Sequence, residues 1–397
     1  MKKTILFTAI SLILLPLESM IYATTKPLVQ IPFNTNGYQT YLEVEVNGSG
    51  EKLCFAFDTG AGSTVLDRNY LGSSNITLTG EKEEMSTSTN VVQVDISQNN
   101  RVNLNGFEIS NIKFYIESLA HLTPAPNGQK VAGVIGFDLL KNYVTYINHE
   151  KNYIELYPKG TELYPNAATL PFYLFEGQLP AFQAILQTES GKKLPVRLVF
   201  DSGASFTMSL ASNFIAKHNM DSELKVKVKV PVIGGAQSSS SVNYLSSMKQ
   251  ISFGGFTFDH VAVNFSTAST GAMATDSVDG VIGFDLIKRF NVVMDYDHKT
   301  IKLIPNNKYN SPFEFNLTGL SFRTKNNEIV VVGVMDYSPA KNAGIKEGDV
   351  VISVDNKKFK SSAELRNYLK ASYKTKTFTV QRASQQLDIV VKPAIFY

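Results

Sequence analysis

The amino-acid sequence predicts a mainly β protein in which one all-β unit occurs twice and is followed by a smaller module with a different pattern. Three observations support this prediction. The 397 residues include 18 Tyr, 25 Phe and 26 Gly, and aromatic residues with glycine-containing turns are typical of β-sheets. Short sequence landmarks recur in the same order in the two halves of the chain. The pattern then changes after a polar segment at residues 306–312.

The composition excludes several classes of protein. Hydrophobic residues make up 43% of the chain, which is enough for two or three globular units, each with a core. The 38 Lys and Arg nearly balance the 35 Asp and Glu, so the chain lacks the basic surface that binds nucleic acid or anionic membranes. The one cysteine, Cys54, can form neither an internal disulfide nor a multi-cysteine metal site, and we expect it to be a small buried strand residue.

The first residues have the pattern of a signal peptide. Lys2 and Lys3 precede an apolar run from Ile5 to Leu17, and Ala23 is a small residue at the expected cleavage point. This run is shorter than the roughly 20 residues that a membrane-spanning helix needs. We therefore expect residues 1–23 to be removed and the mature chain to be exported, to the periplasm or outside the cell, without a membrane span.

An internal repeat divides most of the chain into two homologous units. The segment FDTGA at 57–61 recurs as FDSGA at 200–204, and VAGVIGFDL at 131–139 recurs as VDGVIGFDL at 278–286. Two further matches keep the same order: Pro32-Phe33 with Pro171-Phe172, and Asn105-Gly106-Phe107 with Gly254-Gly255-Phe256. Four ordered matches indicate a duplicated structural unit. The first half is predicted to span residues 28–160 and the second half residues 166–310.

Within each half, the sequence predicts short strands separated by glycine and polar turns. Those of the first half are Tyr41–Val46, Leu53–Phe57, Arg101–Leu104 and Ile112–Ile116. A hairpin ends each half: Val144–Asn148 with Asn152–Tyr157, and Val292–Tyr296 with Thr300–Ile304. The few expected helices are short, at Phe137–Asn142 and Leu210–His218.

Asp58 and Asp201 occupy matched positions at the ends of apolar strands, and a glycine follows each of them two residues later, Gly60 and Gly203. Because glycine has no β-carbon, two such loops can approach each other closely. Two carboxyl groups brought together would share one proton, since like charges at short distance cannot both ionise. Such a pair can take a proton from water while giving one to a carbonyl oxygen.

The residues that follow the two aspartates, Thr59 and Ser202, carry hydroxyl groups at matched positions. We expect these hydroxyls to form hydrogen bonds across the two loops and hold them in place. A single Asp-Thr-Gly or Asp-Ser-Gly segment is weak evidence, because either aspartate alone is also a common turn residue. The duplication at matched positions favours a functional pair.

These loops resemble the catalytic loops of retropepsin-like aspartic proteases, arranged as two protease halves in one chain as in pepsin-like enzymes. Val134-Ile135-Gly136 and Val281-Ile282-Gly283 are similar to the apolar-apolar-Gly segment of that family. The resemblance implies two β-barrel halves that form a pseudo-dimer within one chain, with Asp58 and Asp201 as the catalytic pair. It also implies short helices at Phe137–Leu140 and Phe284–Ile287.

The resemblance further implies a flap, the hairpin that closes over the substrate in this family. In the second half, Gly234 and Gly235 give a candidate hairpin tip within residues 230–236. In the first half, residues 82–94 have the matching place but contain no glycine and no flap tyrosine. The sequence therefore departs from the family pattern at the first flap.

Residues 317–393 resemble a bacterial PDZ domain, an α+β fold. The run SPAKNAGIKEGD at 338–349 is distinctive, and a helix is expected at Ser362–Ala371. The segment Gly319-Leu320-Ser321-Phe322 is similar to the family's carboxylate-binding loop. In that family the loop captures a peptide C-terminus while the peptide adds as a strand to the sheet. The expected ligand of this module is therefore a peptide C-terminus.

The function expected from these features is that of an exported aspartic endopeptidase acting on polypeptides, as a monomer, with no metal and no cofactor. The five histidines lack paired ligand spacing, and no nucleophile elbow or phosphate loop occurs. One alternative is a non-catalytic scaffold whose PDZ domain carries the function. Another is a site formed by pairing with a second copy of the chain.

Overall fold

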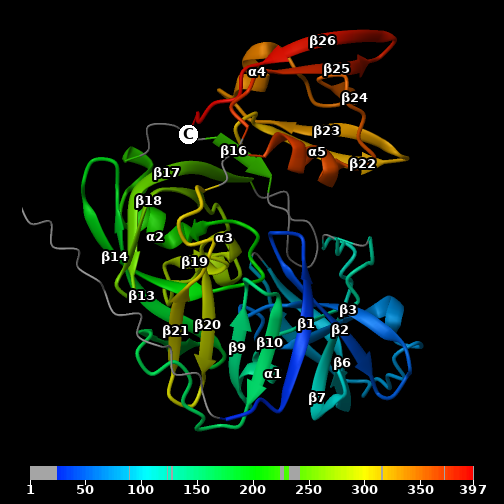
Figure 1. The fold of residues 1–397 in the computed structure, drawn as a ribbon, viewed down its shortest axis with the longest axis vertical. Helices are drawn as coiled ribbons and strands as arrows, with labels where there is room; N and C mark the ends of the chain where they lie inside the picture. Colours follow the sequence, from blue (N-terminus) through cyan, green and yellow to red (C-terminus); the bar gives the residue numbers. More distant parts are fainter. Residues whose placement is uncertain are drawn as a thin grey trace, which may run out of the picture.

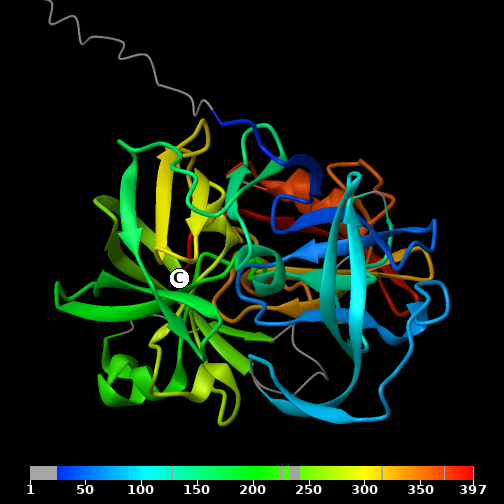
Figure 2. The ribbon, with the colours of Figure 1, turned by 90° about the horizontal axis from the view of Figure 1, so that it is seen from below.

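The computed structural model describes residues 25–396 apart from 89, 123, 127, 224–227, 232–241, 314–315 and 371. Strands dominate the fold (Figure 1). Seen from below, the first and second halves lie side by side, with the C-terminal module behind them (Figure 2). Among the described residues, no helix has the length and apolar character needed to cross a membrane.

The first half is a β-barrel closed by pairing of β2 with β6. Its sheet runs β2-β3-β8-β4-β7-β6-β5. The elements of this half are β1 Val29–Thr35, β2 Thr40–Val46, β3 Lys52–Phe57, β4 Thr64–Asp67, β5 Lys82–Ser86, β6 Val91–Leu104, β7 Phe107–Glu117, β8 Gly133–Ile135, α1 Phe137–Leu140, β9 Val144–Asn148 and β10 Tyr153–Tyr157, with a 3₁₀ turn at Arg68–Tyr70.

The second half repeats this barrel strand for strand. Its sheet runs β12-β13-β14-β19-β15-β18-β17-β16, and β13 pairs with β17 as β2 does with β6. The elements of this half are β11 Ala168–Pro171, β12 Tyr173–Phe175, β13 Leu179–Gln187, β14 Lys193–Phe200, β15 Met208–Leu210, α2 Ser212–Lys217, β16 Val228–Pro231, β17 Val242–Phe253, β18 Phe256–Phe265, β19 Gly280–Ile282, α3 Phe284–Ile287, β20 Phe290–Asp295 and β21 Thr300–Pro305, with 3₁₀ turns at Met220–Ser222 and Ala272–Ala274.

A six-stranded antiparallel sheet joins the two halves, in the order β11-β21-β20-β9-β10-β1. The strands β9 and β20 meet at its centre, where Tyr146 pairs with Val293. These two residues are repeat equivalents, 147 positions apart, like the matched segments that begin at 131 and 278. A local twofold axis therefore passes between them and relates one half to the other.

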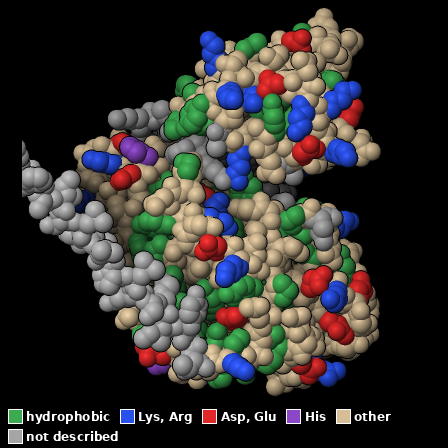
Figure 3. All heavy atoms as spheres, in the orientation of Figure 1, with side chains coloured by type: hydrophobic (Ala, Val, Ile, Leu, Met, Phe, Trp, Pro, Cys, Tyr) green, Lys and Arg blue, Asp and Glu red, His purple; other side chains and the backbone are tan. Residues whose placement is uncertain are grey.

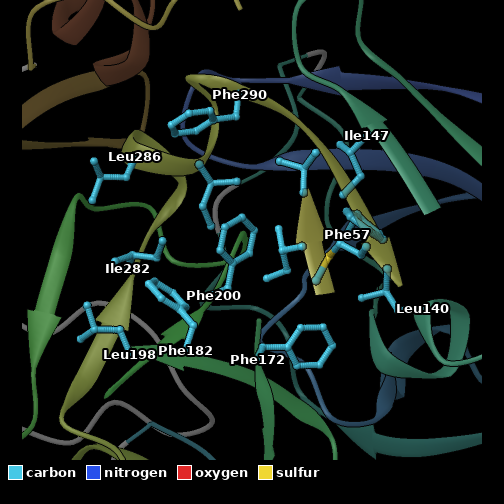
Figure 4. Close-up of a cluster of buried hydrophobic side chains, with 14 of the residues drawn as sticks. Phe57, Leu140, Ile147, Phe172, Phe182, Leu198, Phe200, Ile282, Leu286 and Phe290 are labelled. Carbon is cyan, nitrogen blue, oxygen red and sulfur yellow. The ribbon is translucent and has the colours of Figure 1, made fainter. Parts of the chain in front are cut away.

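One hydrophobic core runs through both halves, because the apolar faces of the barrels and of the shared sheet meet. Phe57 and Phe200, the residues before the two aspartates, are 1% and 0% exposed. Figure 4 shows side chains of both halves converging there, including Leu140 and Ile147 of the first half and Phe182 and Phe290 of the second. The strands that carry the aspartates are thus packed against this core.

The C-terminal module is a separate five-stranded antiparallel sheet with its own core. Strand β22 lies at one edge of this sheet, beside α5 (Figure 1). Its elements are β22 Leu320–Lys325, β23 Glu328–Val334, α4 Pro339–Ala343, β24 Val350–Val354, α5 Ser362–Leu369, β25 Lys376–Arg382 and β26 Gln385–Val391. The helices begin at capping serines, Ser338 for α4 and Ser361 for α5.

The connection between the second half and the module is anchored by Arg289, which is 2% exposed. Its guanidinium donates to the backbone carbonyls of Tyr309, Ser311 and Pro312. It also lies 4.0 Å from the centre of the Phe313 ring, a cation–π contact. The polar segment predicted as a linker is therefore docked on the protein body.

The short helices α1 and α3 and the hairpins β9–β10 and β20–β21 occur where the sequence predicts them, except that α1 ends at Leu140, as the resemblance implies, and not at Asn142. The helix predicted at Leu210–His218 is shorter, Ser212–Lys217, because Met208–Leu210 forms strand β15 beside β18 and β19. Helix α5 ends at Leu369, two residues before the predicted end.

Candidate active site

The two aspartates lie at the ends of equivalent strands, Asp58 after β3 and Asp201 after β14. Strands β8 and β19 run parallel to β3 and β14 and pass behind these ends. The backbone N–H of Asp58 donates to Ile135 O at 3.0 Å, and that of Asp201 donates to Ile282 O at 3.1 Å. The apolar-apolar-Gly segments thus support the aspartate loops, as the sequence resemblance implies.

Gly136 and Gly283 are required where these segments pass the loops. A β-carbon on Gly136 would lie 1.9 Å from Asp58 O, and one on Gly283 would lie 2.1 Å from Phe206 O. No real side chain tolerates such contacts, so only glycine permits this approach. Short helices α1 and α3 begin directly afterwards.

Thr59 and Ser202 form the reciprocal hydrogen bonds that the sequence predicts between the two loops. The Thr59 hydroxyl donates to Phe200 O at 2.7 Å and accepts from Ser202 N at 2.9 Å. The Ser202 hydroxyl accepts from Thr59 N at 3.0 Å. Both residues are almost completely buried, at 0% and 1% exposure. Each loop therefore holds the other in place without contact with water.

The glycines Gly60 and Gly203 let each aspartate reach the opposite half. A β-carbon on Gly60 would lie 2.4 Å from the Asp201 carboxyl carbon, and one on Gly203 would lie 2.2 Å from that of Asp58. Backbone N–H groups complete each loop: Gly60 donates to Asp58 Oδ1 at 2.7 Å and Gly203 donates to Asp201 Oδ1 at 2.8 Å. The structure therefore brings all six predicted loop residues together within one chain.

The two carboxyl groups are hydrogen-bonded to each other and share one environment. Burial raises the pKa of Asp58, although hydrogen bonds from Asp201 and from backbone N–H groups oppose the rise. The pKa of Asp201 is raised well above its usual range, first by burial and then by the charge of Asp58. The pair thus retains a shared proton to higher pH than an ordinary carboxyl group.

A second pair of contacts, which was not predicted from the sequence, braces the site. The Thr64 hydroxyl donates to Asp138 Oδ2 at 2.9 Å, and the Thr207 hydroxyl donates to Asp285 Oδ2 at 3.1 Å. These contacts tie β4 to α1, and the residue that precedes β15 to α3. A signal was present, because both threonines lie six residues after an aspartate and both acids fall in the repeated Gly-Phe-Asp-Leu segment.

The hairpin β5–β6 forms at the place predicted for the first flap, without the family's glycine tip. Thr87 closes its turn, since its hydroxyl donates to Asn90 O and accepts from Asn90 N, both at 3.0 Å. The tip then reaches the second half: Ala272 N donates to Thr87 O and Met273 N donates to Ser88 O, each at 3.0 Å. The first flap is therefore a strap between the halves, held by backbone hydrogen bonds that sequence patterns do not encode.

The second flap candidate, Gly234 and Gly235, lies outside the described residues. The adjoining strands are described, and β16 pairs antiparallel with β17.

In the C-terminal module, the predicted carboxylate-binding loop leads into the edge strand β22. Gly319 has a φ of 75°, a left-handed conformation that favours glycine. Leu320 and Phe322 are 3% and 6% exposed and belong to the module's core. Arg366 of α5 donates to Phe322 O at 3.1 Å. The loop and helix thus border one side of an edge strand that has no further strand beside it among the described residues.

Cys54 lies buried in β3, four residues before Asp58, in a cluster with Tyr41 and Val65. Burial raises the pKa of its thiol to about 11, and nearby Glu43 adds to the rise. A thiol with this pKa is a poor nucleophile at neutral pH. Among the described residues, no group of three His, Cys, Asp or Glu side chains is arranged to hold a metal ion.

Comparisons with known proteins agree with this architecture. The aspartyl protease family model matches residues 42–139 and 186–286, and the PDZ domain model matches residues 317–392. An aspartic proteinase from Irpex lacteus has a similar solved structure, with a TM-score of 0.47 and 13% identity over 71% of this chain and 98% of that chain. The predicted fold class, two homologous β-barrel halves with a C-terminal PDZ domain, is confirmed.

Curated relatives match over shorter segments. A probable CtpA-like serine protease of Staphylococcus aureus (strain COL) is 36% identical over 77 residues, which is 19% of this chain and 16% of the relative. Serine protease HTRA1 of Xenopus tropicalis is 33% identical over 63 residues, which is 16% of this chain and 14% of the relative. The chain therefore spans about a sixth of the length of these relatives.

Proposed function

Because the chain belongs to the aspartyl protease family, we propose that it is an aspartic endopeptidase in which Asp58 and Asp201 activate water. The observation that carries this proposal is the hydrogen-bonded carboxyl pair with raised pKa values at the meeting point of the two halves. Raised pKa values at such a site are suited to proton transfer. A scaffold without activity would not need both acids.

The proposed reaction follows from the one proton that the pair shares. The ionised member of the pair, written here as Asp58, takes a proton from a water molecule bound between the carboxyls. The water oxygen attacks the peptide carbonyl while Asp201 gives its proton to the carbonyl oxygen. The resulting gem-diol collapses, the C–N bond breaks, and the amine leaves with the proton from Asp58. As the carbonyl re-forms, one hydroxyl of the gem-diol gives its proton to Asp201, so the pair is restored to its starting state.

A proteolysis assay with paired variants tests this proposal. The chain from residue 24 onward should cleave an unfolded polypeptide more rapidly at acid than at neutral pH, because the pair must hold one proton. Asp58→Asn and Asp201→Asn should each reduce the rate by at least about 100-fold. A peptide that mimics the tetrahedral intermediate should inhibit, whereas a serine-directed fluorophosphonate should not. Full activity in either variant, or inhibition by the fluorophosphonate, contradicts the aspartic mechanism.

We further propose that the PDZ domain binds the C-terminus of a polypeptide and so recruits substrate. The edge strand β22 and the loop at Gly319 support this proposal, because a peptide can add as a strand beside β22. A labelled peptide with a free carboxylate should bind more tightly than its amidated form. Gly319→Ala should weaken binding, because a β-carbon there would lie 2.1 Å from Ser338 Cβ. Gly333→Ala is the matched control, with its nearest contact at 3.4 Å.

Export remains a proposal based on the N-terminal pattern of residues 1–23. Sequencing of the N-terminus of the protein recovered from cells and from the surrounding medium tests it. A mature terminus near residue 24 in an extracytoplasmic fraction is the expected result.

A further inference from the structure

A cavity of about 240 Å³ lies apart from the aspartate pair, where the two halves and the C-terminal module meet. Its lining comes from the end of β1, the β9–β10 turn, α3, the docked connection and the residue after α5. Figure 3 shows Lys and Arg side chains along the seam between the module and the protease halves on the face drawn there. Neither Asp58 nor Asp201 lines this cavity.

One wall of the cavity contains His149, which can be compared with the equivalent residue of the other half. His149 packs edge-on against Phe33 and Phe284, with ring centroids 6.0 and 5.4 Å away. Its repeat equivalent, 147 positions later, is Tyr296. Tyr296 packs in the same way against Phe172 and Phe137, the equivalents of Phe33 and Phe284, at 5.2 and 5.7 Å. The two halves thus build the same aromatic arrangement, but the central residue differs.

The His149 ring is buried and polar, yet both of its nitrogens lack a hydrogen-bond partner. The residue is 2% exposed and lines the cavity. A buried polar group without a partner costs about 1–3 kcal/mol, so such a group is commonly satisfied by something bound beside it. An N–H of the ring is therefore without a partner beside the cavity that His149 lines.

Cationic side chains line much of the cavity wall. They are Lys288, Arg289, Lys308 and Lys370, and Asp285 is the only acid among the described lining residues. Lys288 Nζ lies 2.8 Å from Asp285 Oδ1. Burial and the nearby Lys288 charge lower the pKa of Lys308, as expected for a buried ammonium group beside another cation.

The equivalent position in the first half lacks this cluster. Lys141 pairs with Asp138 at 2.6 Å, as Lys288 does with Asp285. However, Asn142 stands where the second half has Arg289. Lys308 belongs to the docked connection and Lys370 to the module, so neither has a counterpart in the repeat. The extra cations and the histidine therefore occur together on one side of the molecule only.

We propose that this cavity binds a small oxyanion, with His149 and Lys308 as its principal contacts. Lys308 Nζ already lies 2.6 Å from His149 O, so its ammonium group and the imidazole ring come from adjoining parts of the wall. An oxyanion would accept the histidine N–H and neutralise part of the lysine charge. Because Lys370 Nζ of the module reaches Tyr38 of the first half at 5.3 Å, the bound anion would also fasten the module to the protease halves.

Binding can be tested with the chain from residue 24 onward and two probes, inorganic phosphate and succinate, against chloride at equal ionic strength. Calorimetry measures affinity, and the ring NMR signals of His149, assigned with His149→Phe, report the site directly. We expect millimolar or tighter binding of at least one probe and a shift of the His149 signals. Tighter binding of phosphate than of succinate indicates an inorganic oxyanion as the natural ligand. Tighter binding of succinate indicates an organic carboxylate.

Three variants separate the site from a general charge effect. Lys308→Met should weaken binding by about tenfold, and His149→Tyr should block it by copying the residue of the other half. Lys141→Met, which removes the equivalent of Lys288 and breaks the same kind of ion pair, should leave affinity unchanged. Unchanged His149 signals with both probes, or equal loss of binding in Lys141→Met, would overturn the proposal and leave a water-filled cavity.

Discussion

The carboxyl group of Asp58 lies directly against the α-carbon of Gly203 in the opposite half. A β-carbon on Gly203 would lie 2.2 Å from the carboxyl carbon of Asp58. In the mirrored arrangement, a β-carbon on Gly60 would lie 2.4 Å from the carboxyl carbon of Asp201. The proposed catalytic geometry therefore depends on the absence of a β-carbon from Gly203 in one half and from Gly60 in the other.

Gly203→Ala should accordingly damage activity far more than an ordinary glycine substitution. The added methyl group must push Asp58 away from its partner, and a displacement of about 1 Å can cost 100-fold in rate. We expect a loss of about 1–3 kcal/mol in unfolding free energy. Gly72→Ala is the control, because nothing lies within 4 Å of its β-carbon position. Peptide hydrolysis and urea unfolding compare the two, and equal effects would contradict the packing argument.

The raised pKa of Asp201 predicts that removal of its charge stabilises the fold at neutral pH. In the unfolded chain the group ionises near its ordinary pKa of 3.8, whereas the folded pair retains its proton to higher pH. Folded protein thus binds more protons, and stability is lost as pH rises above 3.8. Asp201→Asn removes this loss, so its midpoint of thermal unfolding should exceed that of the wild type at pH 7. The difference should shrink towards pH 3. A lower midpoint at pH 7 would contradict this sign.

The hydroxyl of Thr59, which is hydrogen-bonded to the opposite loop, should contribute more to the free energy of unfolding than a buried hydroxyl without a partner. Thr59→Val leaves Phe200 O and Ser202 N without partners, at about 1–3 kcal/mol for each group. Thr40→Val is the control, since Thr40 is 0% exposed and its hydroxyl forms no hydrogen bond. That variant should be neutral or stabilising. Urea unfolding of both variants at one pH measures the difference.

His149 should make the protein less stable in acid. Burial, together with the charge of Lys308, lowers the pKa of His149 to about 3. Between pH 6.5, its ordinary pKa, and pH 3, only the unfolded chain takes up a proton there, which costs about 1.4 kcal/mol per pH unit. His149→Phe should therefore flatten the decline of stability over this window, as measured by urea unfolding.

His298 provides a control of opposite sign in the equivalent hairpin. Its pKa is raised by the hydrogen bond to Asp295, at 2.7 Å, so it binds its proton more readily in the folded state. His298→Asn should slightly lower stability in acid rather than raise it. The same direction of change in both variants would contradict the assignment to His149.

The strap formed by hairpin β5–β6 should have to open before a polypeptide enters. Ser88→Cys with Met273→Cys places two thiols on adjacent backbone segments, where Met273 N donates to Ser88 O at 3.0 Å. Oxidation should suppress hydrolysis of a polypeptide, and reduction should restore it. Single-cysteine variants are the controls, and buried Cys54 should not react. Full activity of the oxidised double variant would show that substrate enters by another route.

The features that could be predicted from the sequence are those formed by residues close together in the chain. The loops at Asp58 and Asp201, the short helices α1 and α3 and the terminal hairpins follow from residues a few positions apart, and duplication made each visible twice. The strap tip at Thr87 could not be predicted, because its partners Ala272 and Met273 contribute backbone N–H groups, which every residue except proline possesses. The cavity beside His149 was missed as well, because its wall is assembled from segments separated by more than 200 residues.

The central pair of the shared sheet has a consequence for how the halves choose their partners. Tyr146 and Val293 face each other on the local twofold axis, and both are buried in one cluster. Two first halves would bring two tyrosines to that point, and two second halves would leave it underfilled with two valines. A large residue opposite a small one is satisfied only by one copy of each. The pairing of β9 with β20 therefore disfavours the association of two identical halves. It favours assembly of the site from one first half and one second half within the same polypeptide.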